Sequence, residues 1–258
     1  MSLTVPAVWP HDVLTLCIDV GGSGIKGAVV DPGGSMVTDR VKVTTPYPCP
    51  PDVLVDQLVQ ISSGFSGYHR VSVGFPGLVR GGVVLEVPAL SRRKFAGRQD
   101  PELAGQWSGF HLATALAHGF DAPVRVANDA DMQGAAVVQG HGLEFVITLG
   151  TGVGTALFED GRVLPHFELS HGPFMSGQSI DIALGEASRK AIGKKNWIKR
   201  VREAIAIFDA MLFYDHLYVG GGNARHLSPA DVGHKGQIVP NSAGILGGVR
   251  IWDLTGPA

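Results

Sequence analysis

Two glycine-rich segments align without a gap and begin 128 positions apart (18 and 146), about half the length of this 258-residue chain. They are residues 18–33 (IDVGGSGIKGAVVDPG) and 146–161 (VITLGTGVGTALFEDG). Each reads as an apolar strand, a glycine turn that holds a hydroxyl residue (Ser23 or Thr151), a second apolar strand and a second turn. The repeat predicts two related halves, each offering backbone N–H groups to an anion, with phosphate the first candidate.

The composition narrows the functional class. The 36 glycines lie between apolar runs, which is typical of tight turns, and a net charge of -2 argues against a dedicated nucleic-acid partner. Two cysteines, Cys17 and Cys49, exclude a disulfide framework and a four-cysteine zinc cluster. No apolar run reaches the roughly 18 residues of a membrane helix, and the first residues lack a signal-peptide pattern. We therefore predict a cytoplasmic protein with no membrane partner.

Strands and helices alternate twice along the chain. Strands lead and helices follow in each half, which predicts an α/β protein with lobes at 1–127 and 128–258, the final helix (243–258) being a candidate to pack back on the first lobe. The expected strands and turns cover 13–45, 71–75, 81–84, 123–127, 146–164 and 216–222, and the expected helices cover 53–62, 111–120, 129–140, 179–213 and 243–251. Residues 91–109 are expected to form a long polar loop with a little helix.

The first glycine turn also matches a dinucleotide-binding pattern, through Gly22, Gly24 and Gly27. That fingerprint needs a helix after its third glycine, whereas AVVDPGG follows here, and the chain has no Walker A sequence. A plain hairpin is the simplest alternative, because glycine is the common solution to a tight turn. Two aligned copies favour anion binding instead, with Lys26 near the phosphates and Asp19 holding a metal through water.

Five motifs in one order resemble a known family. They are DVGGSGIKG (19–27), GFPGLV with GGVV (74–79 and 81–84), VANDAD (126–131), LGTGVGTALFEDG (149–161) and YVGGGNA (218–224). The chain resembles the ROK family of sugar kinases across nearly its whole length, and is most similar in style to polyphosphate glucokinases. The resemblance implies the two-lobed actin-like ATPase (ribonuclease H-like) fold, with duplicated βββαβαβα halves, and a homodimer.

The resemblance also assigns roles. Asp129 would be the general base that accepts the proton of a hexose hydroxyl, while Mg²⁺ is bound through water by Asp19 and ATP or polyphosphate is the phosphoryl donor. Without the resemblance, Asn128 or Asp129 could simply cap the following helix. The phosphate-binding candidates are Asp19, Gly21, Gly22, Ser23, Gly24, Lys26, Gly150, Thr151, Gly152 and Gly154. The nucleoside-side candidates are Gly220, Gly221, Gly222 and Asn223.

Sugar recognition needs polar side chains aimed at ring hydroxyls. By resemblance the sugar-binding candidates are Gly74, Pro76, Gly77, Asn128, Asp129, Glu168 and His171. Two positions depart from the family pattern: Ser170 replaces a glycine in the Glu168–His171 motif, and Ala89 stands where an asparagine usually contacts the sugar. The cysteine cluster that binds zinc in many members is missing, so no structural zinc is expected.

The sequence leaves several alternative interpretations open. The basic runs at 92–98 and 194–202 are either solvated surface or a path for a polyanionic donor. Ala89 and Ser170 motivate a catalytically weak sugar-binding or regulatory relative as the alternative function. A repressor of the same family needs a helix-turn-helix ahead of the first strand, where the expected segment is too short. A nicotinamide-dependent enzyme is the least favoured alternative function.

Overall fold

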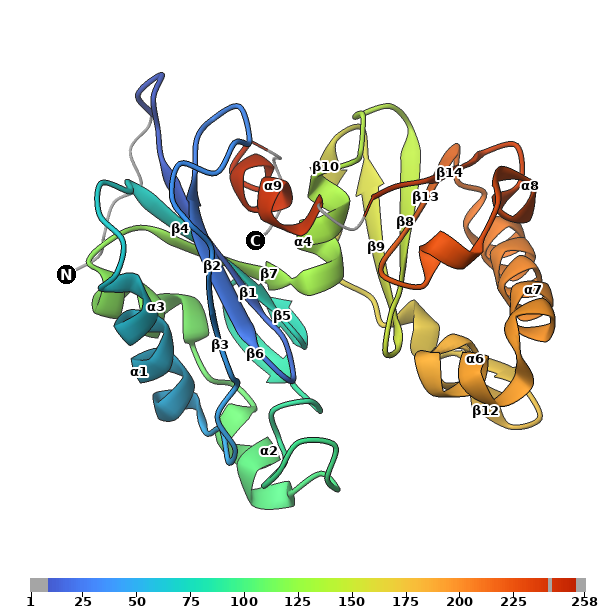
Figure 1. The fold of residues 1–258 in the computed structure, drawn as a ribbon, viewed down its shortest axis with the longest axis horizontal. Coiled ribbons are helices and arrows are strands. Elements are labelled where there is room, and N and C mark those ends of the chain that lie inside the picture. Colours follow the sequence, from blue (N-terminus) through green and yellow to red (C-terminus); the bar gives the residue numbers. More distant parts are fainter. Residues whose placement is uncertain (1–8, 241–242, 254–258) are drawn as a thin grey trace. The chain divides into compact units, whose positions relative to one another are not determined.

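A computed structural model describes residues 9–240 and 243–253 of the chain. It divides into two compact units (Figure 1). The first unit comprises Met1–Ala136 and Gly244–Ala258, and the second unit comprises Val137–Ala243. No helix within the described ranges is both long and apolar enough to cross a membrane.

The first unit is built on a five-stranded sheet in the order β3-β2-β1-β4-β7. Its strands are β1 (Thr15–Val20), β2 (Ile25–Val30), β3 (Val41–Val43), β4 (Arg70–Phe75) and β7 (Val124–Asn128). The first three are joined antiparallel, whereas β4 and β7 run parallel to β1. Every residue of β4 is buried, which is typical of a central parallel strand covered on both faces.

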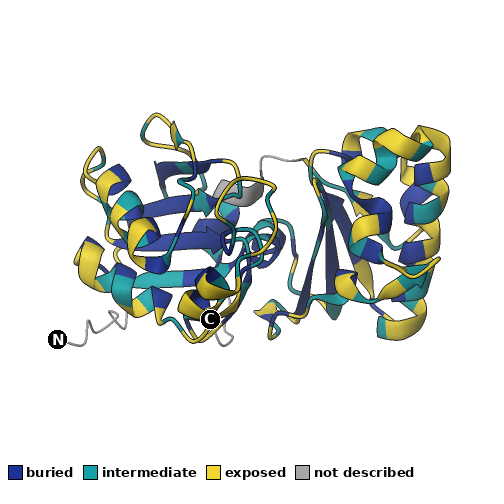
Figure 2. Ribbon diagram, turned by 90° about the horizontal axis from the view of Figure 1, so that it is seen from below, coloured by how far each residue is buried: buried dark blue, intermediate teal, exposed yellow. Residues whose placement is uncertain are grey.

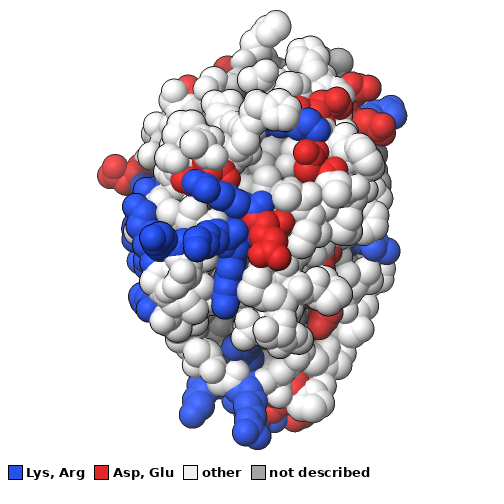
Figure 3. Space-filling view, turned by 90° about the vertical axis from the view of Figure 1, so that its right-hand side faces the viewer, with Lys and Arg blue, Asp and Glu red and all other residues white. Residues whose placement is uncertain are grey.

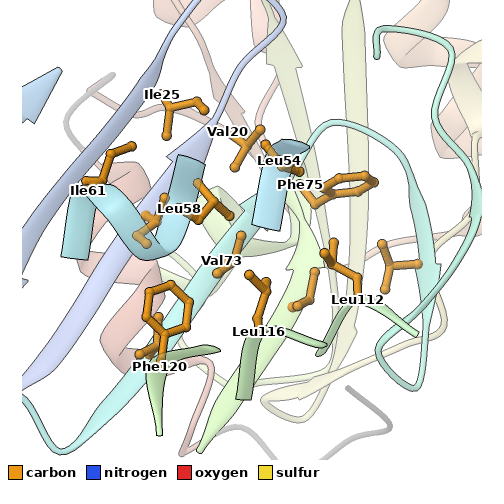
Figure 4. Packing of buried hydrophobic residues seen from close by; sticks show 14 of the residues in the cluster. Val20, Ile25, Leu54, Leu58, Ile61, Val73, Phe75, Leu112, Leu116 and Phe120 are labelled. Carbon is orange, nitrogen blue, oxygen red and sulfur yellow. The ribbon is translucent and has the colours of Figure 1, made fainter. Parts of the chain in front are cut away.

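Two helices cover one face of this sheet: α1 (Pro51–Ser62) and α3 (Leu112–Phe120). Proline at the first position of α1 suits a helix start, and α1 buries Leu54, Leu58 and Ile61 at helical spacing. Figure 4 shows these side chains packed with those of the strands and of α3. The hairpin of β5 (Leu78–Arg80) and β6 (Val83–Glu86) and the short α2 (Pro101–Trp107) complete the unit on this side.

The opposite face is covered by α4 (Asp129–Ala135) and α9 (Ala243–Arg250). Their approach is close, since a Cβ on Gly247 would collide with the carbonyl of Met132. The hydroxyl of Ser72 on β4 also donates to the carbonyl of Gly248. The chain therefore divides after Ala136 rather than after residue 127 as predicted, because α4 packs on the sheet that precedes it.

The second unit repeats the strand order of the first as β10-β9-β8-β13-β14. Its strands are β8 (Leu143–Leu149), β9 (Val153–Glu159), β10 (Arg162–Val163), β13 (His216–Gly220) and β14 (Gly236–Ile238). Again the first three are antiparallel neighbours and the last two are parallel to the first strand of the unit. Each unit therefore follows the predicted βββαβαβα order, with α9 packed in the first unit.

Helices α5 (Ile180–Leu184), α6 (Glu186–Ile192), α7 (Lys194–Leu212) and α8 (Pro229–Val232) belong to this unit, with the small strands β11 (Pro173–Met175) and β12 (Gln178–Ser179). The buried stripe of α7 includes Trp197, Val201 and Phe208, while its outer side is exposed (Figure 2). The short β14 and α8 were missed by the sequence pattern, and the third strand of the first unit is shorter than expected.

The ungapped alignment of the two glycine segments is wrong for their first strands. β1 and β2 are separated by four residues, 21–24, whereas β8 and β9 are separated by three, 150–152. Asp19 pairs with Lys26, and the equivalent cross-strand pair is Thr148 with Gly154. Asp19 therefore corresponds to Thr148 and not to Ile147, because a one-residue slip in a strand moves a side chain to the opposite face.

Candidate functional site

The first glycine hairpin is closed by its own backbone and leaves several donors available. The N–H of Gly21 donates to the carbonyl of Gly24 at 3.0 Å. Among the residues that the structure describes, the N–H groups of Gly22, Ser23 and Gly24 make no hydrogen bond. Ser23 is exposed as well. A fixed turn with free N–H and O–H donors has the chemistry of an anion-binding nest.

Side chains from neighbouring segments hold this hairpin by its carbonyls. The hydroxyl of Thr45 donates to Gly21 at 2.6 Å, and that of Tyr47 reaches Gly22 at 2.7 Å. The Tyr47 hydroxyl also lies 3.0 Å from the carbonyl of Ala89. The loop that carries Ala89 is thereby tied to the glycine hairpin, a link that the sequence pattern did not indicate because these residues lie far apart in the chain.

Asp19 and Lys26 face each other across β1 and β2. The Lys26 ammonium lies 3.3 Å from a carboxylate oxygen of Asp19, and both side chains are about two-fifths exposed (40% and 38%). Both ions of the pair are therefore accessible to solvent, and each can still contact phosphate oxygens or a hydrated cation. An exposed carboxylate is a suitable ligand for a magnesium ion that keeps several of its waters.

Three parallel strands bring the other first-unit candidates to one edge of the sheet. Asp19 on β1 pairs in register with Gly74 on β4, and Gly74 pairs with Ala127 on β7. Adjacent strands lie about 4.8 Å apart, so Asp19 and Ala127 are about 10 Å apart at the backbone. Asp129 follows two residues after Ala127, at the start of α4. Carboxyl ends of parallel strands are the usual place for ligands in such sheets.

Asn128 is the residue that caps α4. Its side-chain oxygen accepts from the N–H of Ala130 at 2.7 Å, and its amide nitrogen donates to the carbonyl of Gly77 at 3.0 Å. The cap thus joins the segment after β4 to the segment after β7. The chain approaches closely here, since a Cβ on Gly74 would lie 3.8 Å from the Cα of Asp129. Gly74, Gly77, Asn128 and Asp129 are brought together as one cluster.

The second hairpin has the same backbone bond as the first. The N–H of Gly150 donates to the carbonyl of Gly152 at 2.9 Å, and Thr151 is exposed at the tip. Within the described part of the chain, the N–H groups of Thr151 and Gly152 make no hydrogen bond. Both hairpins therefore offer unused N–H groups beside a hydroxyl side chain, as the repeat predicted for each half.

Asp181, in the first turn of α5, was missed by sequence reasoning. Its carboxylate accepts from the N–H of Val153 at 2.7 Å and lies against Gly152, where a Cβ would collide with it. The acid ties α5 to the glycine hairpin and explains why residue 152 carries no side chain. Only the fold brings Asp181 to this hairpin, so no local pattern could have indicated it.

The glycine turn after β13 packs on the same hairpin. The N–H of Asn223 donates to the carbonyl of Leu149, and its side-chain amide donates to that of Gly150, both at 2.9 Å. Gly221 has φ +83° and no room for a Cβ, which would collide with the backbone of Leu149. The phosphate-side and nucleoside-side candidates of the second unit are therefore adjacent, with Gly220 at the end of β13 and Gly222 exposed.

Glu168 lies between two histidines. Its carboxylate oxygens are 3.6 Å from Nε2 of the buried His166 and 3.8 Å from Nε2 of the exposed His171. The nearby imidazole of His166, together with the charge of His171, holds the pKa of Glu168 below its usual range despite burial. His166 was not among the predicted residues, and it lies buried beside the carboxylate.

The candidates thus form two groups, each within its own unit. The first unit holds the first hairpin with Asp19 and Lys26, together with the cluster around Asp129. The second unit holds the second hairpin, the Gly220–Asn223 turn and the pair of Glu168 and His171. Within the described ranges, no group of three or more His, Cys, Asp or Glu side chains has the arrangement of a metal centre.

The fold and these hairpins define a class. Two five-stranded sheets of one topology, each opening on a glycine hairpin with free N–H groups, constitute the duplicated actin-like ATPase fold. Residues 15–166 match the ROK family, and the chain belongs to that family.

Comparisons with individual proteins agree with this family assignment. The chain is 29% identical over 255 residues to the polyphosphate glucokinase of Mycobacterium tuberculosis (strain CDC 1551 / Oshkosh), covering 89% of this chain and 88% of that one. It is 29% identical over 157 residues to an N-acetylmannosamine kinase of Escherichia coli O157:H7, covering 58% and 49%. The structure of an inorganic polyphosphate/ATP-glucomannokinase from Arthrobacter sp. strain KM superposes with a TM-score of 0.75 at 26% identity, covering 93% and 98%.

A ROK family glucokinase from Streptomyces griseus, solved with glucose and AMPPNP, has the same fold, with a TM-score of 0.71 at 18% identity and coverage of 92% and 98%.

Proposed function

We propose that this protein is a sugar kinase that transfers a phosphoryl group from ATP or polyphosphate to a hexose hydroxyl. One observation carries the proposal: the same sheet occurs twice, each copy presents a hairpin of unused N–H groups, and one copy places Asp129 near Asp19 at the carboxyl ends of its strands. The named activities of its relatives, polyphosphate glucokinase and polyphosphate/ATP-glucomannokinase, support it.

Asp129 is proposed as the general base. Phosphoryl transfer consists mainly of positioning and charge stabilisation, with a carboxylate orienting the attacking hydroxyl and accepting its proton. Because Asn128 already caps α4, helix capping does not explain the carboxylate at position 129. The hydrogen bond from the Asn128 side chain to the carbonyl of Gly77 helps to fix the backbone next to Asp129.

Charge on the donor is proposed to be balanced by both hairpins and by Lys26. The N–H groups and hydroxyls at Ser23 and Thr151 would contact phosphate oxygens, and Lys26 would add a positive charge. Asp19 is exposed enough to hold a hydrated Mg²⁺, which when bound would neutralise charge on the donor phosphates. The Gly220–Asn223 turn is proposed to face the nucleoside when ATP is the donor.

Sugar recognition is proposed for Glu168, His171, Asn128, and the Gly74-Phe75-Pro76-Gly77 segment. The lowered pKa of Glu168 favours the anionic form, which accepts hydrogen bonds from ring hydroxyls. Ala89 has no polar side chain, so we do not expect a sugar contact at that position. The proposal extends to a cytoplasmic homodimer without structural zinc, on composition and family resemblance.

Purified protein with Mg²⁺ should form sugar phosphate from at least one hexose when given ATP or polyphosphate. Asp129→Asn should lower kcat by about 10²–10⁴ while sugar affinity, measured by calorimetry, stays within a few-fold of the wild-type value. The proposal is refuted if a broad panel of sugars yields no phosphosugar with either donor, or if Asp129→Asn retains full activity.

The alternative is a sugar-binding or regulatory relative with weak catalysis. Two substitutions favour it: Ala89 at a usual sugar contact, and the fully buried Ser170 in place of a glycine beside His171. Sugar binding in the calorimeter without turnover on either donor would support this alternative over the kinase.

A further inference from the structure

One face of the second unit carries exposed cations at the start of α7 and in the short 3-10 helix Ala224–His226. Within the described part of the chain, Lys194, Lys195, Lys199 and Arg225 form no ion pair, and all four are exposed. Figure 3 shows lysine and arginine side chains gathered on one side of this face of the second unit. Lys195 and Lys199 are one helical turn apart, about 6 Å along the axis of α7.

This basic surface begins beside the second glycine hairpin. The N–H of Glu186, the first residue of α6, donates to the carbonyls of Gly150 and Thr151, both at 3.1 Å. Its carboxylate is held by Arg189 through two bonds of 2.8 Å and by Lys190 at 3.2 Å. The hairpin, the start of α6 and the side chains of Arg189 and Lys190 are therefore contiguous.

His226 directly follows Arg225 in the short 3-10 helix Ala224–His226. Its pKa is lowered by desolvation and then by the charges of Arg189, Arg225 and Lys194, while the charge of Glu186 opposes the shift. The ring of His226 packs edge-on against Trp197 of α7, with centroids 6.4 Å apart. Arg225 directly precedes His226, and Lys194 lies three residues before Trp197, so this ring contact brings the segment that carries Arg225 to the N-terminal part of α7.

We propose that Arg225, Lys194, Lys195 and Lys199 form a binding surface for a linear polyphosphate chain whose end occupies the second glycine hairpin. Polyanions bind through several cations in series, and unpaired side chains give the largest gain because they break no existing ion pair. The inference rests on the proposed function for the identity of the donor. It adds a surface outside the hairpins on which a long donor gains contacts that a short one cannot reach.

The other basic run does not offer the same chemistry. Arg93 is already bonded to Asp100 and to Glu102, and the Arg92 guanidinium donates to the carbonyl of Pro88. Two cations of that run are therefore engaged within the protein. Lys94 and Arg98 remain exposed there and provide a matched pair for a control.

The test compares two double charge reversals of equal net charge change. Lys195→Glu with Lys199→Glu alters the proposed surface, and Lys94→Glu with Arg98→Glu alters the other run. Binding of long-chain polyphosphate is measured across a salt series, and KM is measured with long-chain polyphosphate and with tripolyphosphate. The surface variant should bind long chains about tenfold more weakly, with a shallower salt dependence, and its ratio of the two KM values should rise by a similar factor.

The control should keep the wild-type affinity, salt dependence and KM ratio. The inference is overturned if the surface variant binds long chains as the wild type does, if the control loses affinity instead, or if wild-type protein phosphorylates sugar from ATP yet binds no polyphosphate. Salt-dependent binding that only the surface variant weakens supports the inference even if no sugar is phosphorylated, in which case only the proposed function fails. Far-UV circular dichroism of both variants checks that each is folded.

Discussion

The contact between Gly152 and Asp181 predicts a strongly coupled pair of substitutions. Gly152 does not have a left-handed φ, so the backbone accepts alanine, but the added methyl would collide with the Asp181 carboxylate. Overpacking of this kind costs about 1–3 kcal/mol. Asp181→Ala removes the acceptor of the buried Val153 N–H, which costs about 1–3 kcal/mol when the donor stays unsatisfied.

The double variant should not show the sum of these costs. With alanine at 181, the methyl at 152 enters the space that the carboxylate vacates, so only the loss of the hydrogen bond remains. We therefore expect a coupling free energy of about 1–3 kcal/mol, opposite in sign to the overpacking cost. Asp181→Asn serves as a control, because its side-chain oxygen can still accept from Val153.

The measurement is urea unfolding of the four proteins, read by hydrogen exchange of the peptides that cover β9, so that the signal belongs to the second unit. The KM for the donor is measured alongside, because a displaced hairpin should weaken the proposed phosphate contacts as well as stability. Additive losses in the double variant, within about 0.5 kcal/mol, would contradict a clash between the methyl and the carboxylate. They would mean that the carboxylate moves away from the methyl at no cost.

Three further outcomes are expected. Asn128→Ala should lose about 1–2 kcal/mol in thermal unfolding, since the N-cap bond to Ala130 is lost, and Asn128→Asp should recover only part of it, because a carboxylate can cap the helix but cannot donate to the carbonyl of Gly77. The pKa of Glu186 is lowered to about 2, chiefly by Arg189, so its ionised form stabilises the fold above pH 4.5 and this effect is lost as pH falls toward 2. In Glu186→Gln, the free energy of unfolding should therefore fall less steeply between pH 4.5 and pH 2. Both cysteines are buried with pKa values raised to about 12, so a thiol reagent at pH 8 should react only after unfolding.

The sequence was sufficient to predict elements whose pattern is local. The helix of α1 follows from Leu54, Leu58 and Ile61 at helical spacing, and both hairpins follow from glycine turns between apolar runs. The duplicated topology follows from the repeat, and the confirmed family membership follows from five motifs in order. Short elements such as β14 have too few residues to show a period, and their formation depends on a neighbour in the sheet.

The candidate site was only partly predictable, because its links join residues that are distant in sequence. Tyr47 reaches the first hairpin from the segment after β3, and Asp181 reaches the second hairpin from α5. A motif identifies the turn but not the side chain that packs on it. The division after Ala136 has the same origin, since α4 joins the first unit through packing on β4 and β7 that no local pattern contains.

The corrected register implies that the two hairpins have a similar backbone fold but different side chains in their equivalent cross-strand pairs. The first has an acid and a base in its cross-strand pair, Asp19 and Lys26, whereas Thr148 and Gly154 occupy the equivalent positions in the second. The second hairpin therefore has no counterpart of the carboxylate and ammonium that are proposed to hold a hydrated metal ion and to contact phosphate at the first. The carboxylate of the second hairpin comes from Asp181 on α5 and is engaged by a backbone N–H. The phosphate charge proposed for the second hairpin must therefore be balanced by cations from elsewhere in its unit. Arg189 and Lys190 on α6 already neutralise Glu186, which leaves the exposed Lys194, Lys195, Lys199 and Arg225.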